Sequence, residues 1–146
     1  MDAYELNEKI GRDKFKKDIK EGTLYEFTAD KYCPVDCHLT GKNNTYVIEI
    51  KNRNIPIEQY KKEGYILELN KYNALMNEWK YSGYTPEYVN YFQDGRLVWK
   101  IKDIDITGRV EKKWCTATTA TDYGKRVLKD VIMLKYDEAY DKQRYN

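Results

Sequence analysis

The sequence of 146 residues predicts one α/β domain, residues 1–146, with a central mixed β-sheet flanked by helices and an extra C-terminal β-hairpin. Three observations favour this fold class. Apolar residues recur at helical spacing near the N-terminus, β-prone runs separated by turn residues follow, and a second helical pattern interrupts those runs. The length suits a single core, and no repeat, low-complexity run or linker divides the chain.

A helix is expected first. In residues 3–21 the apolar side chains approximate one stripe at helical spacing, with Lys and Glu elsewhere, and Gly22 ends the pattern. A short β-prone stretch follows over residues 23–27 and ends in a polar turn.

Two β-prone runs around a turn cluster then predict a hairpin. Residues 33–39 look like a strand whose start is marked by Pro34, because proline is tolerated at the first position of a strand. Residues 41–44 form the turn. The second strand, residues 45–51, carries adjacent apolar residues that suggest burial on both faces, so the two charges at its end need a reason.

A short helix, a longer helix and a second hairpin are expected next. Residues 56–60 can open a short helix, and residues 66–79 carry apolar side chains at helical spacing. The strongest hairpin signal joins residues 88–92 to residues 97–101 through the turn Asp94-Gly95.

The C-terminal part predicts the extra hairpin. Its strands are the β-prone stretches 113–119 and 126–134, joined by a polar connection, and the tail from Tyr136 is polar. This hairpin, which includes Trp114, could reach toward nucleic acid or toward a second subunit, and the sequence does not choose between them.

Composition excludes several classes of protein. No apolar run approaches the roughly 18 residues that a spanning helix needs, so we expect no membrane association. The odd number of cysteines, 3, and a start without the order of a secretory signal favour a cytoplasmic location. With 26 Lys and Arg against 24 Asp and Glu, the charge alone does not indicate nucleic-acid binding.

Four residues around the first hairpin carry the chemistry. Asp36 is expected in mid-strand, and Glu49 and Lys51 share one face of the next strand, so pairing can bring them together. Neighbouring carboxylates repel without a cation, and hard oxygen ligands suit Mg²⁺. The carbonyl of Ile50 could supply a third ligand, and Lys51 would orient or deprotonate a water molecule. Metal-assisted phosphodiester hydrolysis needs these groups.

The segments Pro34-Val35-Asp36 and Glu49-Ile50-Lys51 resemble the motif of the PD-(D/E)xK nuclease superfamily, with one residue inserted in its first part. Residues 49–53, Glu-Ile-Lys-Asn-Arg, are also similar to the E-x-K-S-R variant of archaeal-type Holliday junction resolvases. The resemblance extends from the first helix to about Trp79. It implies a restriction-endonuclease-like core and a DNA endonuclease that uses Mg²⁺ or Mn²⁺, with Asp36 and Glu49 as metal ligands and Lys51 as the catalytic lysine.

The resemblance also implies accessory features. Glu8 or Glu5 on the first helix matches a further acidic residue of many members, and Gln59 matches the position of a glutamine in the RecB-like branch. Small members act on duplex or branched DNA as homodimers, and a small stand-alone nuclease suits a bacteriophage, which would place it in the host cytoplasm. The candidate DNA contacts, chosen because they flank the motif in sequence, are Lys42, Arg53, Lys61 and Lys62.

Other interpretations stay open. The chain could keep the nuclease fold as a non-catalytic module that binds nucleic acid or protein, or Glu49 and Lys51 could form a solvated cross-strand pair. A zinc site from Cys33, Cys37 and His38 would need the distant Cys115 and lacks a usual finger spacing. Two cysteines four apart in a strand would share one face as small buried thiols, and His38 is expected to be packed or exposed.

Overall fold

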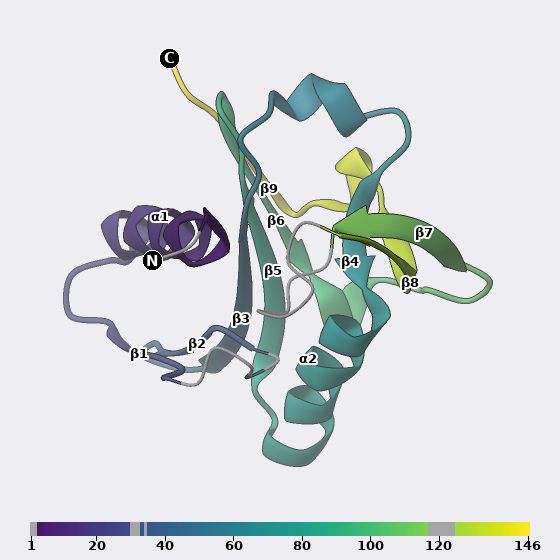
Figure 1. The fold of residues 1–146 in the computed structure, drawn as a ribbon. Helices are drawn as coiled ribbons and strands as arrows, with labels where there is room; N and C mark the ends of the chain where they lie inside the picture. Colours follow the sequence, from purple (N-terminus) through teal and green to yellow (C-terminus); the bar gives the residue numbers. More distant parts are fainter. Residues whose placement is uncertain (1–2, 30–32, 34, 117–124) are drawn as a thin grey trace.

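The computed structural model describes residues 3–29, 33, 35–116 and 125–146. Its main sheet has six strands in the order β1-β2-β3-β5-β6-β9 (Figure 1). Neighbouring strands are antiparallel except β3 and β5, which are parallel, so the sheet is mixed. The strands are β1 (Leu24–Phe27), β2 (Cys37–Thr40), β3 (Thr45–Asn52), β5 (Thr85–Tyr91), β6 (Gly95–Lys100) and β9 (Asp141–Arg144).

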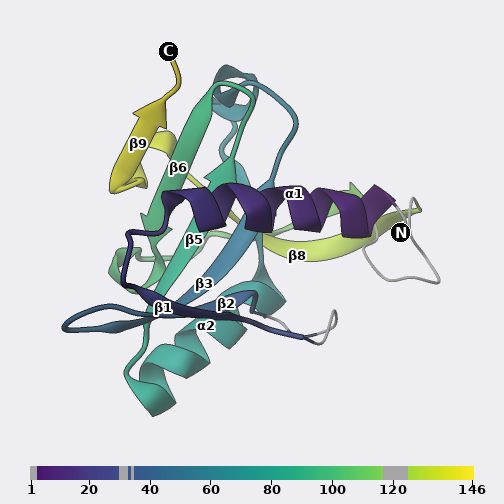
Figure 2. The ribbon, with the colours of Figure 1, turned by 90° about the vertical axis from the view of Figure 1, so that its left-hand side faces the viewer.

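Helices and a smaller sheet cover the two faces of the main sheet. The remaining elements are α1 (Ala3–Asp18), α2 (Leu69–Ser82), the short helices η1 (Ile57–Tyr60), η2 (Ile101–Asp103) and η3 (Tyr136–Glu138), and the strands β4 (Tyr65–Glu68), β7 (Val110–Thr116) and β8 (Arg126–Leu134). Helix α1 crosses one face, while α2 and the sheet β4-β8-β7 lie on the other (Figures 1 and 2). The predicted α/β fold with a C-terminal hairpin is confirmed.

Strand β3 lies between the two hydrophobic cores, one on each face of the main sheet. Val47 belongs to the core under α2 and Ile48 to the core under α1, and their exposed fractions are 0% and 2%. The prediction of a strand buried on both faces is therefore confirmed. Strand β5 pairs with β3 from Tyr46 to Asn52, but β2 pairs with it only from Thr45 to Ile48. The second half of β3 consequently has an edge without a partner strand.

Two predicted elements differ from the structure. The strand expected from residue 33 begins at Cys37, and Pro34 lies outside the described residues. The helix expected from Ile66 is preceded by β4, because apolar residues at 65 and 67 alternate and pair with β8, and the helix starts at Leu69. A short apolar run fits both periods, so periodicity alone could not separate them.

The polar tail also forms an unpredicted strand. Strand β9 pairs with β6 through its main chain, and its side chains are mostly exposed. An edge strand held this way has no apolar pattern to reveal it. Residues 117–119, which were expected to extend β7, lie outside the described part of the chain.

Helix α1 buries only its C-terminal half. Phe15 is 7% exposed, whereas Leu6 and Ile10 of the expected apolar stripe are 50% and 37% exposed. The helix lies close to the sheet at Gly11, where an added Cβ would lie 3.3 Å from Cγ2 of Ile50. The N-terminal half of α1 therefore overhangs the free edge of β3.

We expect Gly11→Val to weaken this contact. The branched side chain would meet Ile50 and displace α1, so the free energy of unfolding should fall by about 1–3 kcal/mol. Lys17→Val, on the exposed side of the same helix, is the matched control, because it introduces the same side chain without the clash. Chemical denaturation measures both variants. Equal stability of the two would contradict the proposed packing.

Candidate active site

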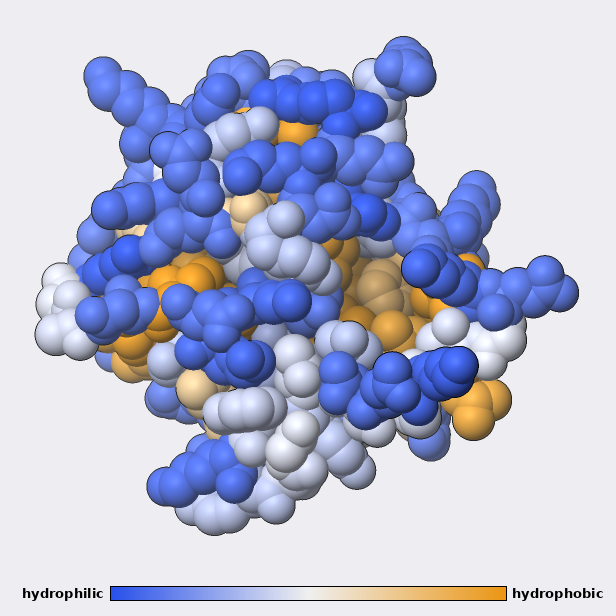
Figure 3. Space-filling view, turned by 180° about the vertical axis from the view of Figure 1, so that it is seen from behind, coloured by the Kyte–Doolittle hydropathy of each residue, from blue (hydrophilic) through white to orange (hydrophobic). Residues whose placement is uncertain are grey.

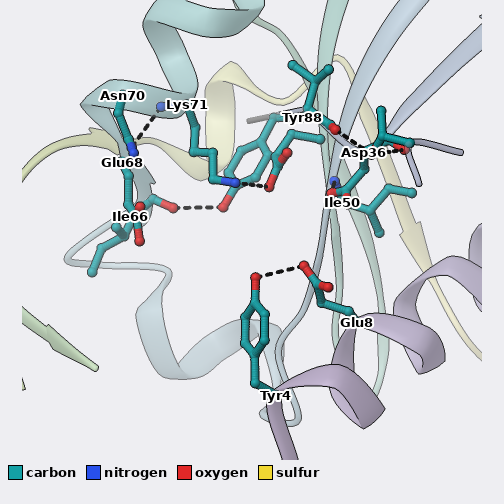
Figure 4. Close-up of polar contacts among 12 residues, drawn as sticks. Tyr4, Glu8, Asp36, Ile50, Ile66, Glu68, Asn70, Lys71 and Tyr88 are labelled. Carbon is teal, nitrogen blue, oxygen red and sulfur yellow. Dashed lines mark hydrogen bonds and ion pairs between the residues drawn. The ribbon is translucent and has the colours of Figure 1, made fainter. Parts of the chain in front are cut away.

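The site forms at the free edge of β3. The main-chain N–H of Ile50 donates to Oδ2 of Asp36 over 2.8 Å, and the N–H of Asp36 donates to the carbonyl of Ile48 over 3.0 Å. Figure 4 shows Asp36 against the strand at Ile50. Because the N–H and C=O of one strand residue point to the same edge, the carbonyl of Ile50 also faces this edge. Asp36 thus lies just before β2 rather than in mid-strand.

Glu49 lies next to Asp36 in a buried position. Its exposed fraction is 8%, and its Oε2 has no hydrogen-bond donor among the described residues. Burial, followed by the negative charge of Asp36, raises the pKa of Glu49 well above its usual value. The structure therefore brings together the two carboxyl groups that the sequence pairs.

Lys51 shares a cleft with Glu49. The cleft has a volume of about 640 Å³, and both side chains line it. Burial, followed by the positive charge of Arg53, lowers the pKa of Lys51. Its ammonium group has no hydrogen bond or ion pair among the described residues, so it is available to a molecule in the cleft.

Helix α1 supplies one wall of the cleft. Tyr4 and Glu8 line it, and the hydroxyl of Tyr4 donates to Oε1 of Glu8 over 2.7 Å (Figure 4). Glu5, the other candidate on this helix, is not among the lining residues. In the described part of the chain, no three Asp, Glu, His or Cys side chains come close enough to hold a metal together, so Glu8 does not join Asp36 and Glu49 as a third ligand.

Two basic residues that the motif did not indicate contact the carboxyl pair. Nη2 of Arg12 lies 3.1 Å from Oδ1 of Asp36, and Nζ of Lys71 lies 3.4 Å from Oε1 of Glu49. Arg12 follows Glu8 by four residues, so helical spacing could have placed it on the same face. Lys71 comes from α2, and its approach depends on how that helix packs, which no local pattern reveals.

Gln59, the predicted accessory residue, lies away from the cleft. Gln59 is exposed on η1, and it does not line the cleft. The helix that reaches the site after the lysine is α2, which begins only after β4. Lys71 of that helix contacts Glu49.

Three of the predicted DNA contacts lie outside the cleft. Lys61 and Lys62 follow η1, where Nζ of Lys61 lies 4.4 Å from the ring centre of Tyr136. Lys42 is at the turn of the β2–β3 hairpin, roughly 20 Å from Asp36 at about 3.3 Å per strand residue. It lines another hollow of about 1000 Å³, whose apolar floor is orange in Figure 3.

Arg53 does line the cleft, but its guanidinium is engaged inside the protein. It donates to the carbonyl of Ile66 over 2.7 Å and to the hydroxyl of Tyr88 over 3.1 Å. Arg53 therefore links the end of β3 to β4 and β5. A role in DNA binding stays a prediction for this residue.

The cysteines and the histidine lie in separate surroundings. Cys33 packs against the core under α2 and Cys37 belongs to the core under α1, so they do not share a face as expected. The alternation fails because residues 33 and 35–36 precede the strand. His38 Nε2 lies 3.6 Å from Oε1 of Glu78 on α2, as expected for a packed histidine, and Cys115 lines the cleft.

The oxygen groups at the edge of β3 fit a divalent cation. Mg²⁺ is commonly held by one or two carboxylates together with waters and substrate phosphates. Asp36 and Glu49 supply two carboxylates, and the carbonyl of Ile50 faces the same edge. The buried Oε2 of Glu49 that lacks a donor is the atom a cation would satisfy.

No protein-family model and no curated protein matches the sequence. Among solved structures, the fold is similar to that of Hjc from Archaeoglobus fulgidus, a Holliday junction resolvase, with a TM-score of 0.54 and 13% sequence identity. The match covers 88% of this chain and 84% of that chain. At this identity the likeness shows a shared mixed α/β fold. No helix in the described part of the chain is long and apolar enough to span a membrane.

The pKa of Glu49 gives a test for the metal site. Because the folded state favours protonated Glu49, the free energy of unfolding of the metal-free protein should fall as the pH rises above about 4.5 toward neutrality. Binding of Mn²⁺ or Mg²⁺ to the folded state should offset this fall, by about 2.7 kcal/mol at a concentration 100 times the Kd. Thermal unfolding with EDTA or with metal measures both effects.

The variants Glu49→Gln and Asp36→Asn should lose the stabilisation by metal. Glu87→Gln is the matched control, because Glu87 is also 8% exposed and its pKa is also raised by burial, but it does not line the cleft. Stabilisation that persists in Glu49→Gln, or that disappears equally in Glu87→Gln, would contradict a metal site at this edge.

Proposed function

We propose that the protein is a nuclease of the resolvase type that hydrolyses phosphodiester bonds of DNA with the aid of Mg²⁺ or Mn²⁺. The observation that carries the proposal is the buried Oε2 of Glu49, which has no donor and lies beside Asp36 in a cleft shared with Lys51. The fold similarity to a Holliday junction resolvase supports the same class of substrate. Assembly as a homodimer and a phage origin remain predictions.

Asp36, Glu49 and the carbonyl of Ile50 are the groups that would hold the metal. When bound, the metal would act as a Lewis acid that polarises the phosphate and lowers the pKa of a bound water. Asp36 is well fixed for this task, since Ile50 and Arg12 donate to its two oxygens, and each oxygen keeps a further lone pair.

Lys51 is the candidate for proton transfer. Its lowered pKa increases the fraction of neutral amine, which can accept a proton from the attacking water, and its protonated form stabilises negative charge on the phosphate. Arg12 and Lys71 add positive charge beside the carboxyl pair, which favours the approach of a phosphodiester anion.

Cleavage of four-way, nicked and linear DNA with and without Mg²⁺ or Mn²⁺ tests the proposal. We expect metal-dependent cleavage that falls by about 10²-fold or more in Lys51→Met, because the proton-transfer group is lost while the length of the side chain is kept. Asp36→Asn and Glu49→Gln should also abolish cleavage. Lys42→Ala, on a different face, should keep it. Cleavage without metal, or undiminished cleavage by Lys51→Met, would refute the assignment.

A non-catalytic binding module is the second candidate. Arg12 and Lys71 already pair with Asp36 and Glu49, so the charges are partly neutralised without a metal. This function predicts DNA binding that metal does not change, with no cleavage under any of the conditions above. Binding that strengthens with metal, or any metal-dependent cleavage, would exclude it.

A further inference from the structure

The β7–β8 hairpin carries an exposed tryptophan at the wall of the cleft. Trp114 on β7 is 61% exposed, whereas Trp99 in the core is fully buried. Trp114 lines the same cleft as Glu49 and Lys51. Figure 2 shows β8 of this hairpin extending behind α1 toward its N-terminal end. The exposed indole therefore presents an aromatic surface to any molecule that occupies the cleft.

Arg126 accompanies Trp114 on the neighbouring strand. Its Nη2 donates to the carbonyl of Trp114 over 3.2 Å, and it also lines the cleft. No carboxylate among the described residues pairs with this guanidinium, so its charge is available to an anion. The other basic side chains of the two strands, Lys112, Lys113 and Lys129, form ion pairs with Asp130, Glu111 and Glu68, so Arg126 is the basic group of these strands that can meet a phosphate.

We propose that Trp114 stacks on an unpaired base of the DNA strand that enters the cleft, while Arg126 contacts a phosphate of that strand. This inference rests on the proposed function and names its substrate class: DNA with unpaired nucleotides. In a continuous duplex both faces of each base are covered by neighbouring bases. Only an unpaired base can therefore lie flat on the indole. The positive charge beside Trp114 favours this polyanion over a protein partner or a second copy of the chain.

Binding in EDTA tests the inference without cleavage. Fluorescence anisotropy would compare a labelled single strand, a forked duplex with single-stranded arms, and a fully paired duplex. Trp114→Ala should weaken binding of the first two by about 10-fold and that of the paired duplex by less than twofold. Trp114→Phe should retain most of the affinity, because the phenyl ring can still stack.

Two controls keep the result specific. Tyr81→Ala removes an aromatic side chain that is 77% exposed outside the cleft, and it should leave all three affinities unchanged. Thermal unfolding should show that Trp114→Ala remains folded. If that variant does not fold, tryptophan fluorescence is measured instead. The single strand should quench the fluorescence of the wild type, and the quenching should be smaller in Trp114→Phe.

Several outcomes would overturn the inference. These are an equal loss for paired and unpaired DNA, no loss in Trp114→Ala, or a change of oligomeric state in that variant, which would indicate contact with a second copy. Cleavage of DNA with binding independent of Trp114 would refute this inference alone. Binding dependent on Trp114 without any cleavage would refute the nuclease proposal and leave the stacking contact in place.

Discussion

The site depends on a difference in length between two paired strands. Strand β2 has four residues and β3 has eight, so the second half of β3 lacks a neighbour on one side. Main-chain groups left without partners away from water are costly, and here side chains satisfy two of them. Asp36 accepts from the N–H of Ile50, and Asn7 donates to the carbonyl of Asn52. These two hydrogen bonds stabilise the edge of β3. They also hold the carboxylate of Asp36 beside Glu49 and attach α1 to the strand.

Burial of the charged groups at this edge costs free energy, because they lose contact with water. Glu49 and Lys51 both have pKa values shifted toward their neutral forms, first of all by burial. Arg12 and Lys71 offset part of the cost, because each pairs with one of the carboxyl groups from a different helix. Hydrophobic residues at these positions would serve stability at least as well. Such local conflict with stability is expected where a site serves function.

Much of this site could be predicted because it is local. A short hairpin brings Asp36 to Glu49, and alternation along one strand places Glu49 and Lys51 together. The predictions failed where position in space departs from position in sequence. Lys42 is close to Asp36 along the chain but sits at the opposite end of the hairpin, and Lys71 reaches Glu49 only through the packing of α2. Strand β9 was not predicted, because it pairs through its main chain and this pairing needs no apolar pattern.

The polar composition of β9 has a consequence for how the molecule meets its neighbours. An outer strand presents free N–H and C=O groups to which a strand of another chain can add, and charged side chains oppose such pairing. Strand β9 reads Asp-Lys-Gln-Arg and forms one border of the six-stranded sheet. Its charges protect that border against edge-to-edge aggregation. Two copies of this protein would therefore associate through side-chain surfaces rather than by continuing the sheet past β9.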